Sequence, residues 1–275
     1  MTPVNHRFLI SGDSPELEVS FPSGTLRIEE SQETNVIIVD IESKHPEYFE
    51  VGQVGDVVLV SYTKGSSRFI DTKAVINVSA PTTTSVKTKV ASADVRVTGE
   101  VAKISAKSAS GDVVLGVVKD TCTVNIASGD ISIDHVMGSC STNSASGDVH
   151  VGAVDGDLKA NSASGDLRVG TAEKTVTART ASGDVSIGVA KGNVSSKSAS
   201  GDLTVDSFAG RQLEVKTVSG DSRITVPAGT RANINARNLS GSVHLPDGPS
   251  DFEGERTDRD ITFKSVSGDL HISTS

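Results

Sequence analysis

Hydrophobic residues along most of this chain recur in fixed columns of an 18-residue repeat. The tripeptide Ser-Gly-Asp begins at Ser110 and returns with the same spacing at Ser128, Ser146, Ser164, Ser182 and Ser200. When this Ser is counted as position 1, positions 4 and 6 are Val, Ile or Leu in these turns, and position 5 is mostly polar. An alternation with a period of two predicts a short strand with one buried face, directly after Gly-Asp.

A second strand is predicted later in each turn. Position 13 is apolar and position 15 is small or apolar, whereas positions 14 and 16 carry Ser, Thr, Lys, Arg or Asn. Position 9 is a third inward point, occupied by Val, Ala or Phe. Each turn therefore contains two short strands, neither of which has enough apolar surface to be stable alone.

The repeat continues less perfectly in both directions. It extends back to Ser92-Ala93-Asp94 and forward, with growing insertions, to Ser219-Gly220-Asp221, Ser240-Gly241-Ser242 and Ser267-Gly268-Asp269. Stacking equivalent strands on one another buries what a single turn cannot. The sequence therefore predicts an all-β protein, a parallel β-solenoid of about ten 18-residue turns over residues 85–275. Connections between parallel strands are almost always right-handed, so we expect the coil to be right-handed.

Residues 1–84 are less regular. Ser23-Gly24-Thr25-Leu26-Arg27-Ile28 imitates the start of a repeat, and Gly55-Asp56-Val57-Val58-Leu59 matches residues 111–115. We interpret this part as irregular early turns or a cap on the exposed end of the sheet, because most of the Phe and Tyr residues lie there. A separate small β-sandwich is the alternative.

Charge and composition exclude some functions. The chain of 275 residues has a net charge of −9, which argues against nucleic acid as the main partner, since phosphate binding needs clustered Lys and Arg. No apolar run approaches the roughly 18 residues of a membrane helix, and residues 1–12 lack the pattern of a secretory signal. We therefore expect a cytoplasmic protein without a membrane span.

Several segments together resemble a known family. These are Val78-Ser79-Ala80-Pro81, Val226-Pro227-Ala228-Gly229-Thr230 and the recurring Ser-Gly-Asp-Val-x-Val. From about Ser23 to Ser275 the chain resembles the bacterial putative-adhesin family, a domain family of unknown function. The resemblance implies a β-solenoid without an established reaction, and the adhesin label presumes export.

The aspartates of the repeat are the most conspicuous chemical feature. If the turns stack in register, neighbouring carboxylates lie about 5 Å apart, and their repulsion must be compensated. The favoured interpretation is an Asx-type corner, in which each carboxylate accepts backbone N–H groups of its own turn. A less favoured one is calcium binding, by Asp112, Asp130, Asp148, Asp166, Asp184 and Asp202, because carboxylates are the usual calcium ligands.

The cysteines and histidines give weaker signals. Cys122 and Cys140 occupy the same inward column, and we favour two buried free thiols over a disulfide. The six histidines show no metal-binding spacing, although His244 and His271 are expected on successive turns. We predict no cofactor and no metal centre.

The repeat is interrupted by an inserted loop at residues 246–260, which is either solvated or a charged docking loop that includes Asp251, Phe252 and Arg256. After it the chain ends on a strand without a polar cap, and an uncovered strand can pair with another copy. We therefore expect a homo-oligomer that forms through the C-terminal turn, with Leu270 and Ile272 near the contact.

Together these features predict a non-catalytic scaffold, a rigid repeat protein that self-associates or presents a polar face to protein partners of unknown identity. No nucleophile, base and stabiliser can be named as a set, so we do not expect an enzyme. The alternative is a surface adhesin-like or carbohydrate-active β-helix protein, because paired carboxylates about 5 Å apart also occur in glycosidases.

Overall fold

The computed structural model describes residues 4–63, 72–245 and 258–275. These residues form 25 strands and one short 3-10 helix, Pro46–Tyr48. The chain forms two compact units, Met1–Gly138 and Ser139–Ser275. The division between them lies inside the regular repeat, well beyond the boundary at 84/85 that the sequence suggests.

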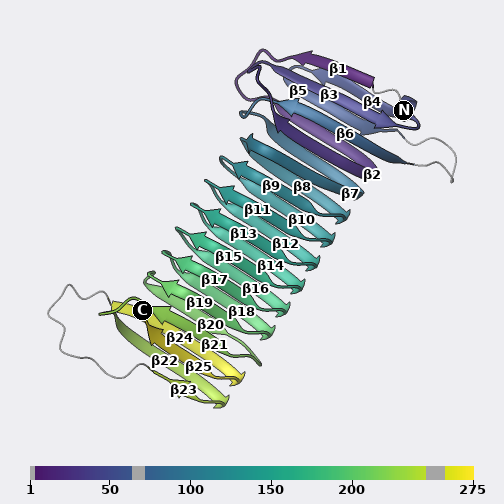
Figure 1. The fold of residues 1–275 in the computed structure, drawn as a ribbon. Helices are drawn as coiled ribbons and strands as arrows, with labels where there is room; N and C mark the ends of the chain where they lie inside the picture. Colours follow the sequence, from purple (N-terminus) through teal and green to yellow (C-terminus); the bar gives the residue numbers. More distant parts are fainter. Residues whose placement is uncertain (1–3, 64–71, 246–257) are drawn as a thin grey trace. The chain divides into compact units, whose positions relative to one another are not determined.

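In the first unit, the regular turns form two parallel ladders (Figure 1). The long strand β7 (Ser85–Val101) passes through a whole corner and pairs with β8 over its first part and with β9 over its last. β10 then stacks on β8, and β11 on β9, and in both pairs the partners are one repeat apart. The bounds are β8 Lys103–Ser110, β9 Val113–Val118, β10 Cys122–Ser128 and β11 Ile131–Val136.

The N-terminal end of this unit is irregular. β2 (Glu16–Glu30) pairs in parallel with β7 on one side and with β5 (Val57–Tyr62) and β6 (Lys73–Ala80) on the other. Beyond them, antiparallel pairs add β3 (Val36–Ser43), β1 (Val4–Leu9) and β4 (Phe49–Val54). Because β2 is shared by the early strands and the regular turns, the sheet continues without interruption across residue 84.

One of the two predicted early corners is confirmed and the other is wrong. Leu26 and Ile28 pair with Val95 and Val97, which is the register expected for a repeat start. Gly55 and Asp56, in contrast, form the two-residue turn of the antiparallel β4–β5 hairpin, because Val54 pairs with Val57. Local similarity to Gly-Asp-Val-Val-Leu therefore did not distinguish a hairpin turn from a solenoid corner.

The second unit also contains two parallel ladders, built from its own strands (Figure 1). One ladder contains the strands that include position 13, and the other contains the strands that follow Gly-Asp and begin at position 4. The bounds are β12 Cys140–Ser146, β13 Val149–Val154, β14 Leu158–Ser164, β15 Leu167–Ala172, β16 Val176–Ser182, β17 Val185–Ala190, β18 Val194–Ser200, β19 Leu203–Phe208, β20 Gln212–Lys216, β21 Ser222–Val226, β22 Arg231–Ser240, β23 Val243–His244, β24 Asp258–Ser267 and β25 Leu270–Thr274.

The predicted columns are confirmed. Residues at equivalent positions pair directly, as Val149 and Leu167 illustrate at position 4. Side chains at positions 4, 6, 9, 13 and 15 are buried in nearly all regular turns, with Phe208 and Phe263 among the largest buried side chains. The protein is therefore an all-β, parallel β-solenoid whose core is a stack of mainly aliphatic columns.

The last turns do not stack in the order of the sequence. β24 pairs with β20 and β22, and β25 pairs with β21 and β23. The chain thus skips one level to form β22 and β23, and then returns to fill the level in between with its C-terminal residues. The outermost described turn of the second unit is 231–244, and the C-terminal turn is internal.

Candidate functional site

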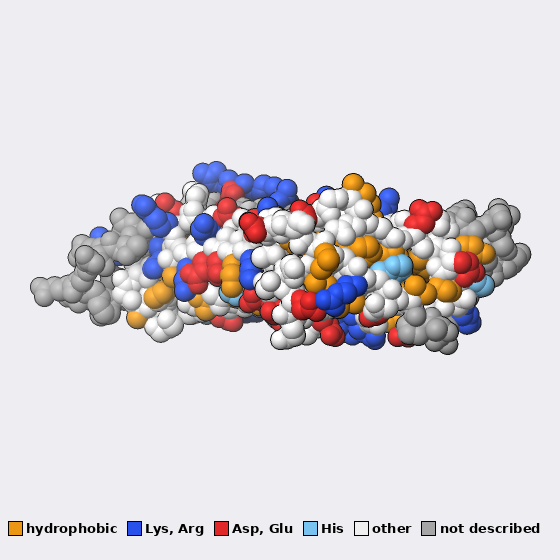
Figure 2. Space-filling view, turned by 90° about the horizontal axis from the view of Figure 1, so that it is seen from above, with side chains coloured by type: hydrophobic (Ala, Val, Ile, Leu, Met, Phe, Trp, Pro, Cys, Tyr) orange, Lys and Arg blue, Asp and Glu red, His pale blue; other side chains and the backbone are white. Residues whose placement is uncertain are grey.

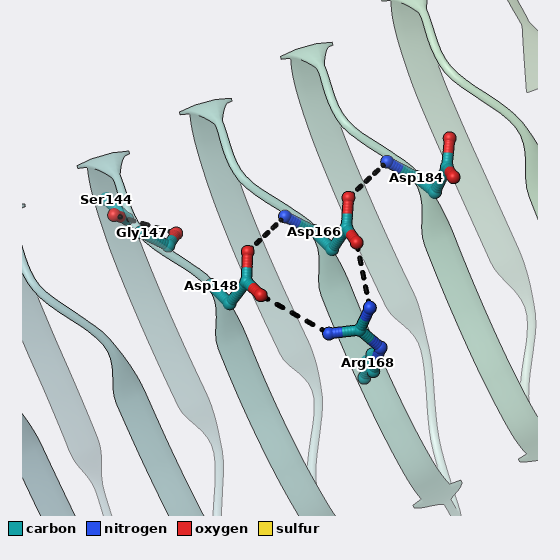
Figure 3. A network of polar contacts seen from close by, with 6 residues as sticks. All are labelled: Ser144, Gly147, Asp148, Asp166, Arg168 and Asp184. Atoms are coloured by element: carbon teal, nitrogen blue, oxygen red, sulfur yellow. Dashed lines mark hydrogen bonds and ion pairs between the residues drawn. The ribbon is translucent and has the colours of Figure 1, made fainter.

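The Ser-Gly-Asp corners of each unit form a ladder of hydrogen bonds. In the second unit, the backbone N–H of Asp166 donates to Oδ1 of Asp148 at 2.9 Å, and Asp184 donates to Asp166 at 3.0 Å (Figure 3). Asp202 donates to Asp184 in the same way at 2.8 Å. In the first unit, Asp112 donates to Asp94, and Asp130 to Asp112, both at 3.0 Å.

This geometry corrects one detail of the sequence interpretation. Each of these carboxylates accepts the N–H of the neighbouring turn, not of its own turn. An aspartate at position 3 therefore ties two turns together, which explains why the column is uniform. The carboxylates of these corners therefore have a structural role.

The ladder follows the stacking order at the C-terminal end. Asp221 donates to Asp202 at 2.8 Å, and Asp269 donates to Asp221 at 2.9 Å. Ser242 then donates to Asp269 at 2.6 Å. Since Ser242 stands where the other turns have Asp, the outermost described turn offers no further carboxylate.

Arginines compensate part of the carboxylate repulsion. Arg168 lies between two turns, with Nη1 3.4 Å from Oδ2 of Asp148 and Nη2 2.8 Å from Oδ2 of Asp166 (Figure 3). Arg223 occupies the equivalent place, at 3.8 Å from Asp202 and 3.9 Å from Asp221. Both arginines are at position 5, where the side chain points outward beside the aspartates.

The six aspartates considered for calcium all belong to these ladders. Among residues 4–63, 72–245 and 258–275, no group of three or more His, Cys, Asp or Glu side chains is arranged to hold a metal ion. His244 and His271 do lie side by side on β23 and β25, as expected, with ring centroids 6.0 Å apart.

A column of hydroxyl groups beneath the corner was missed by the sequence analysis. Ser144 donates to the carbonyl oxygen of Gly147 at 3.3 Å, and Thr180 to that of Gly183 at 3.2 Å (Figure 3 shows the first). These residues occupy position 17, which is Ser or Thr in most turns. That preference was a visible signal, but an inward hydroxyl cannot be told from a solvated one by composition alone.

Small residues make up much of the outer surface of the corner. Position 18, just before the corner Ser, is an exposed alanine in six regular turns: Ala109, Ala127, Ala145, Ala163, Ala181 and Ala199. On the face drawn in Figure 2, acidic, basic and hydrophobic side chains (red, blue and orange) are interspersed among white atoms. We call the exposed Ala, Ser, Gly and Asp residues at positions 18, 1, 2 and 3 the corner face.

A shallow hollow of about 400 Å³ lies in the first unit, where the aspartate ladder begins. Its lining includes Glu42, Lys73 and Asp94, together with Gly24 and Ala74. The lining residues come from β2, β3, β6 and β7, and β6 pairs with β2 on the side away from β7. The sequence did not predict it, since it depends on the irregular N-terminal pairing.

The interaction residues proposed for the C-terminal end need correction. Leu270 and Ile272 are buried, and β25 has paired neighbours on both sides. The prediction that they lie at an uncovered end is therefore wrong, because the chain end fills an inner level of the stack. Asp251, Phe252 and Arg256 lie outside the described residues.

One arginine from the end of the inserted segment is described and is buried. Arg259 donates from Nε to the carbonyl oxygen of Gly210 at 2.9 Å, from Nη2 to that of Ala209 at 3.4 Å, and from Nη1 to Oγ1 of Thr230. Burial away from water lowers the pKa of the Arg259 guanidinium below its ordinary value. The side chain thereby fastens the outermost loop, at Thr230, to a turn two levels inside.

Both cysteines are free and buried, as favoured from the sequence. None of the described residues belongs to a helix that is long and apolar enough to cross a membrane.

The fold and the corner define a β-solenoid built from Ser-Gly-Asp turns, and comparison with known proteins gives it a family. The model of the Toastrack DUF4097 family, a domain family of unknown function, matches residues 15–211 and, in a second overlapping match, 120–275. The chain therefore belongs to the Toastrack DUF4097 family. No curated protein matches the sequence.

Several solved structures are similar to this chain at low sequence identity. A putative adhesin from Bacteroides fragilis has 14% identity and a TM-score of 0.39, with 98% of this chain and 97% of that chain covered. A putative adhesin from Parabacteroides distasonis has 11% identity and a TM-score of 0.40, with the same coverage of 98% and 97%. A putative lipid binding protein from the same organism has 12% identity and a TM-score of 0.28, with 97% and 96% covered.

Proposed function

We propose that this protein is a non-catalytic scaffold that presents the corner face to a protein partner. The observation that carries the proposal is the aspartate ladder. In each unit, the carboxylates that could otherwise bind a ligand or act on a substrate accept N–H groups from the next turn, at 2.8–3.0 Å. These hydrogen bonds hold neighbouring turns together.

The surface left by this arrangement is suited to contact along its length. Exposed alanine and serine residues recur beside half-buried glycines at the spacing of stacked strands, about 4.8 Å. A partner can therefore approach the backbone closely over several turns. Because Arg168 and the aspartates beside it compensate one another, the charge of the face is locally balanced rather than uniformly acidic.

Site-specific photo-crosslinking in cells tests this function. A photoreactive amino acid at Ala163 lies on the corner face, whereas the same group at Lys159, an exposed residue of the same strand β14, lies away from the corner. We expect discrete crosslinked proteins from position 163 and from its equivalent Ala181, and few from position 159.

Two results contradict the proposal. Equal crosslinking from positions 163 and 159 would remove the corner face as the binding surface. Turnover of a substrate by the purified protein, abolished by Asp166→Asn with the fold intact, would show that the ladder takes part in catalysis.

A further inference from the structure

The outermost described turn of the second unit is built like an internal turn. β22 alternates inward small and apolar residues, Ala232, Ile234 and Ala236, with outward polar ones. In the neighbouring β24, the same columns are filled by the fully buried Ile261 and Phe263, whereas the inward residues of β22 are only half-buried. Among the described residues, β22 has a partner along one edge only, β24.

The last polar positions of the internal hydroxyl column also lack partners. Nδ2 of Asn238 and Oγ of Ser265, which pair in register at position 17, are buried without a hydrogen bond. In the turn inside them, Thr217 donates to the carbonyl oxygen of Ser219 at 3.0 Å. In the second unit, Ser144, Thr180 and Thr217 of this column have partners and Ser162 has none, whereas at the end both neighbouring positions lack one.

An apolar stripe is confined to the same end. At position 18, the six regular turns have alanine, but the last three levels have Val218, Val266 and Leu239 in stacking order. Their exposed fractions are 54%, 49% and 85%. Val243 and Leu245, which would be inward residues if the stack continued, are 39% and 52% exposed. Exposed apolar clusters of this kind are typical of interfaces.

The edge also lacks acidic residues. No Asp or Glu occurs between Arg231 and Leu245, and Ser242 replaces the corner aspartate. Two copies of this edge can therefore meet without bringing carboxylates of their ladders together. An edge strand that carried the usual aspartate would oppose such pairing.

From these observations we infer that β22 and β23 form an interface with a second copy of this chain. The two copies meet end to end around a twofold axis, and the β22 strands pair antiparallel, since a twofold axis reverses the strand direction. A second copy is the partner whose cross-section matches both strands and the corner of the terminal turn at once. In the dimer, the half-buried inward residues of the two β22 strands cover one another.

The charges of β22 select a register. If Asn235 faces its own copy at the axis, Asn233 faces Arg237 and Arg231 faces Leu239. A shift by one residue toward the N-terminus would instead place Arg231 opposite Arg237, and like charges directly opposite each other are unfavourable. The register centred on Asn235 avoids this pair.

This interface is the free strand edge of β22 and β23, whereas the crosslinking positions Ala163 and Ala181 lie on inner turns, so the two proposals can fail independently. The first experiment measures mass by light scattering on a sizing column over a hundredfold range of protein concentration. We expect a dimer that dissociates on dilution. Leu239→Arg should raise its dissociation constant about threefold or more, because in this register residue 239 faces Arg231 of the second copy at two symmetric places, and like charges directly opposite each other are unfavourable. Leu239 is exposed in one copy, so the fold should not change.

Leu9→Arg is the matched control, because Leu9 is an exposed leucine (65%) at the edge of the other unit. It should leave the dissociation constant unchanged. A monomer at every concentration, open-ended growth beyond the dimer, or equal effects of Leu9→Arg and Leu239→Arg would overturn the inference.

Disulfide trapping tests the register. Opposite Cα atoms in an antiparallel pair lie about 4.5–5.5 Å apart, which is within disulfide range, so Asn235→Cys should give a covalent dimer on oxidation. Asn233→Cys is the control on the same strand and face, where the two copies of the residue lie roughly 14 Å apart. The wild-type chain controls for Cys122 and Cys140, which are buried. Crosslinking of Asn233→Cys as fast as Asn235→Cys would overturn the register.

Discussion

Substitution of the corner glycine Gly183 by alanine is the sharpest test of how the turns stack. Gly183 has a φ of +143°, and a Cβ atom there would lie 2.3 Å from the carbonyl oxygen of Gly165 in the preceding turn. A non-glycine residue in such backbone costs about 1–3 kcal/mol. The clash is with backbone, so no side-chain rotation relieves it, and overpacking of this kind adds about 1–3 kcal/mol. Alanine also makes the unfolded chain less flexible, which offsets about 0.4–1 kcal/mol, so we expect a net loss of about 1–5.6 kcal/mol in the free energy of unfolding.

Gly229→Ala is the matched control, because Gly229 also has a positive φ, +77°, but no atom lies within 4 Å of a Cβ built there. Only the left-handed backbone is penalised, by about 1–2 kcal/mol, and the less flexible unfolded chain offsets about 0.4–1 kcal/mol of this. We therefore expect a net loss of about 0–1.6 kcal/mol. The difference between the two variants isolates the contact between turns.

Urea unfolding followed by circular dichroism gives both free energies by linear extrapolation. Because repeat proteins can unfold in parts, hydrogen exchange should accompany it and show whether protection is lost around residues 165–201 in Gly183→Ala. Equal destabilisation by Gly183→Ala and Gly229→Ala would refute the close stacking of corners from which the ladder is argued.

Three further predictions concern single side chains, the first two measured by the same unfolding and the third by hydrogen exchange. Thr180→Val should lower the free energy of unfolding by about 0.5–1.5 kcal/mol, because it removes a buried hydroxyl that is hydrogen-bonded. Thr142→Val should be neutral or stabilising, because the buried Oγ1 of Thr142 has no partner. The opposite order would contradict the hydroxyl column. Asp184→Ala should cost about 0.5–1.5 kcal/mol by removing the acceptor for the next turn, and Asp184→Asn, which keeps an acceptor oxygen, should cost less; equal losses would argue against the ladder. Arg259→Met should expose the amides of residues 258–275 to hydrogen exchange, since it removes the donor to the carbonyl oxygens of Ala209 and Gly210. Arg231→Met on the exposed edge should not have this effect. Equal exchange in both variants would argue against the role of Arg259 in holding the last turns together.

Much of the fold follows from the sequence, because a repeat of fixed length carries its own register. Once Ser-Gly-Asp recurs at a constant spacing, apolar residues at positions 4, 6, 9, 13 and 15 must stack in columns. Apart from Thr180 at position 17, the buried residues of β13 to β19 occupy these positions. The side-chain alternation along a strand fixes which face is buried. The aspartate column and the two buried thiols could be predicted from the same register.

The order of the turns at the two ends could not be predicted in this way. β2 lies inside β5 and β6, and β25 lies inside β23, although the chain order suggests the reverse. Parallel strands with the same apolar pattern fit equally well at neighbouring levels of the stack. The pattern therefore specifies how a strand aligns with its neighbours, but not which level of the stack it occupies. Long-range packing decides it, in part through side chains such as Arg259, which joins the outermost loop to a turn two levels inside.

The same reason explains the error at the candidate interface. Leu270 and Ile272 stand last in the chain and were therefore placed at an open end, whereas the structure opens the edge at β22. The sequence alone determined the repeat, the inward columns and the polar corner, because these depend on spacing along the chain. Only the tertiary structure decided which turn ends the stack and from which turn each carboxylate receives its hydrogen bond, because both depend on which strands become neighbours in space.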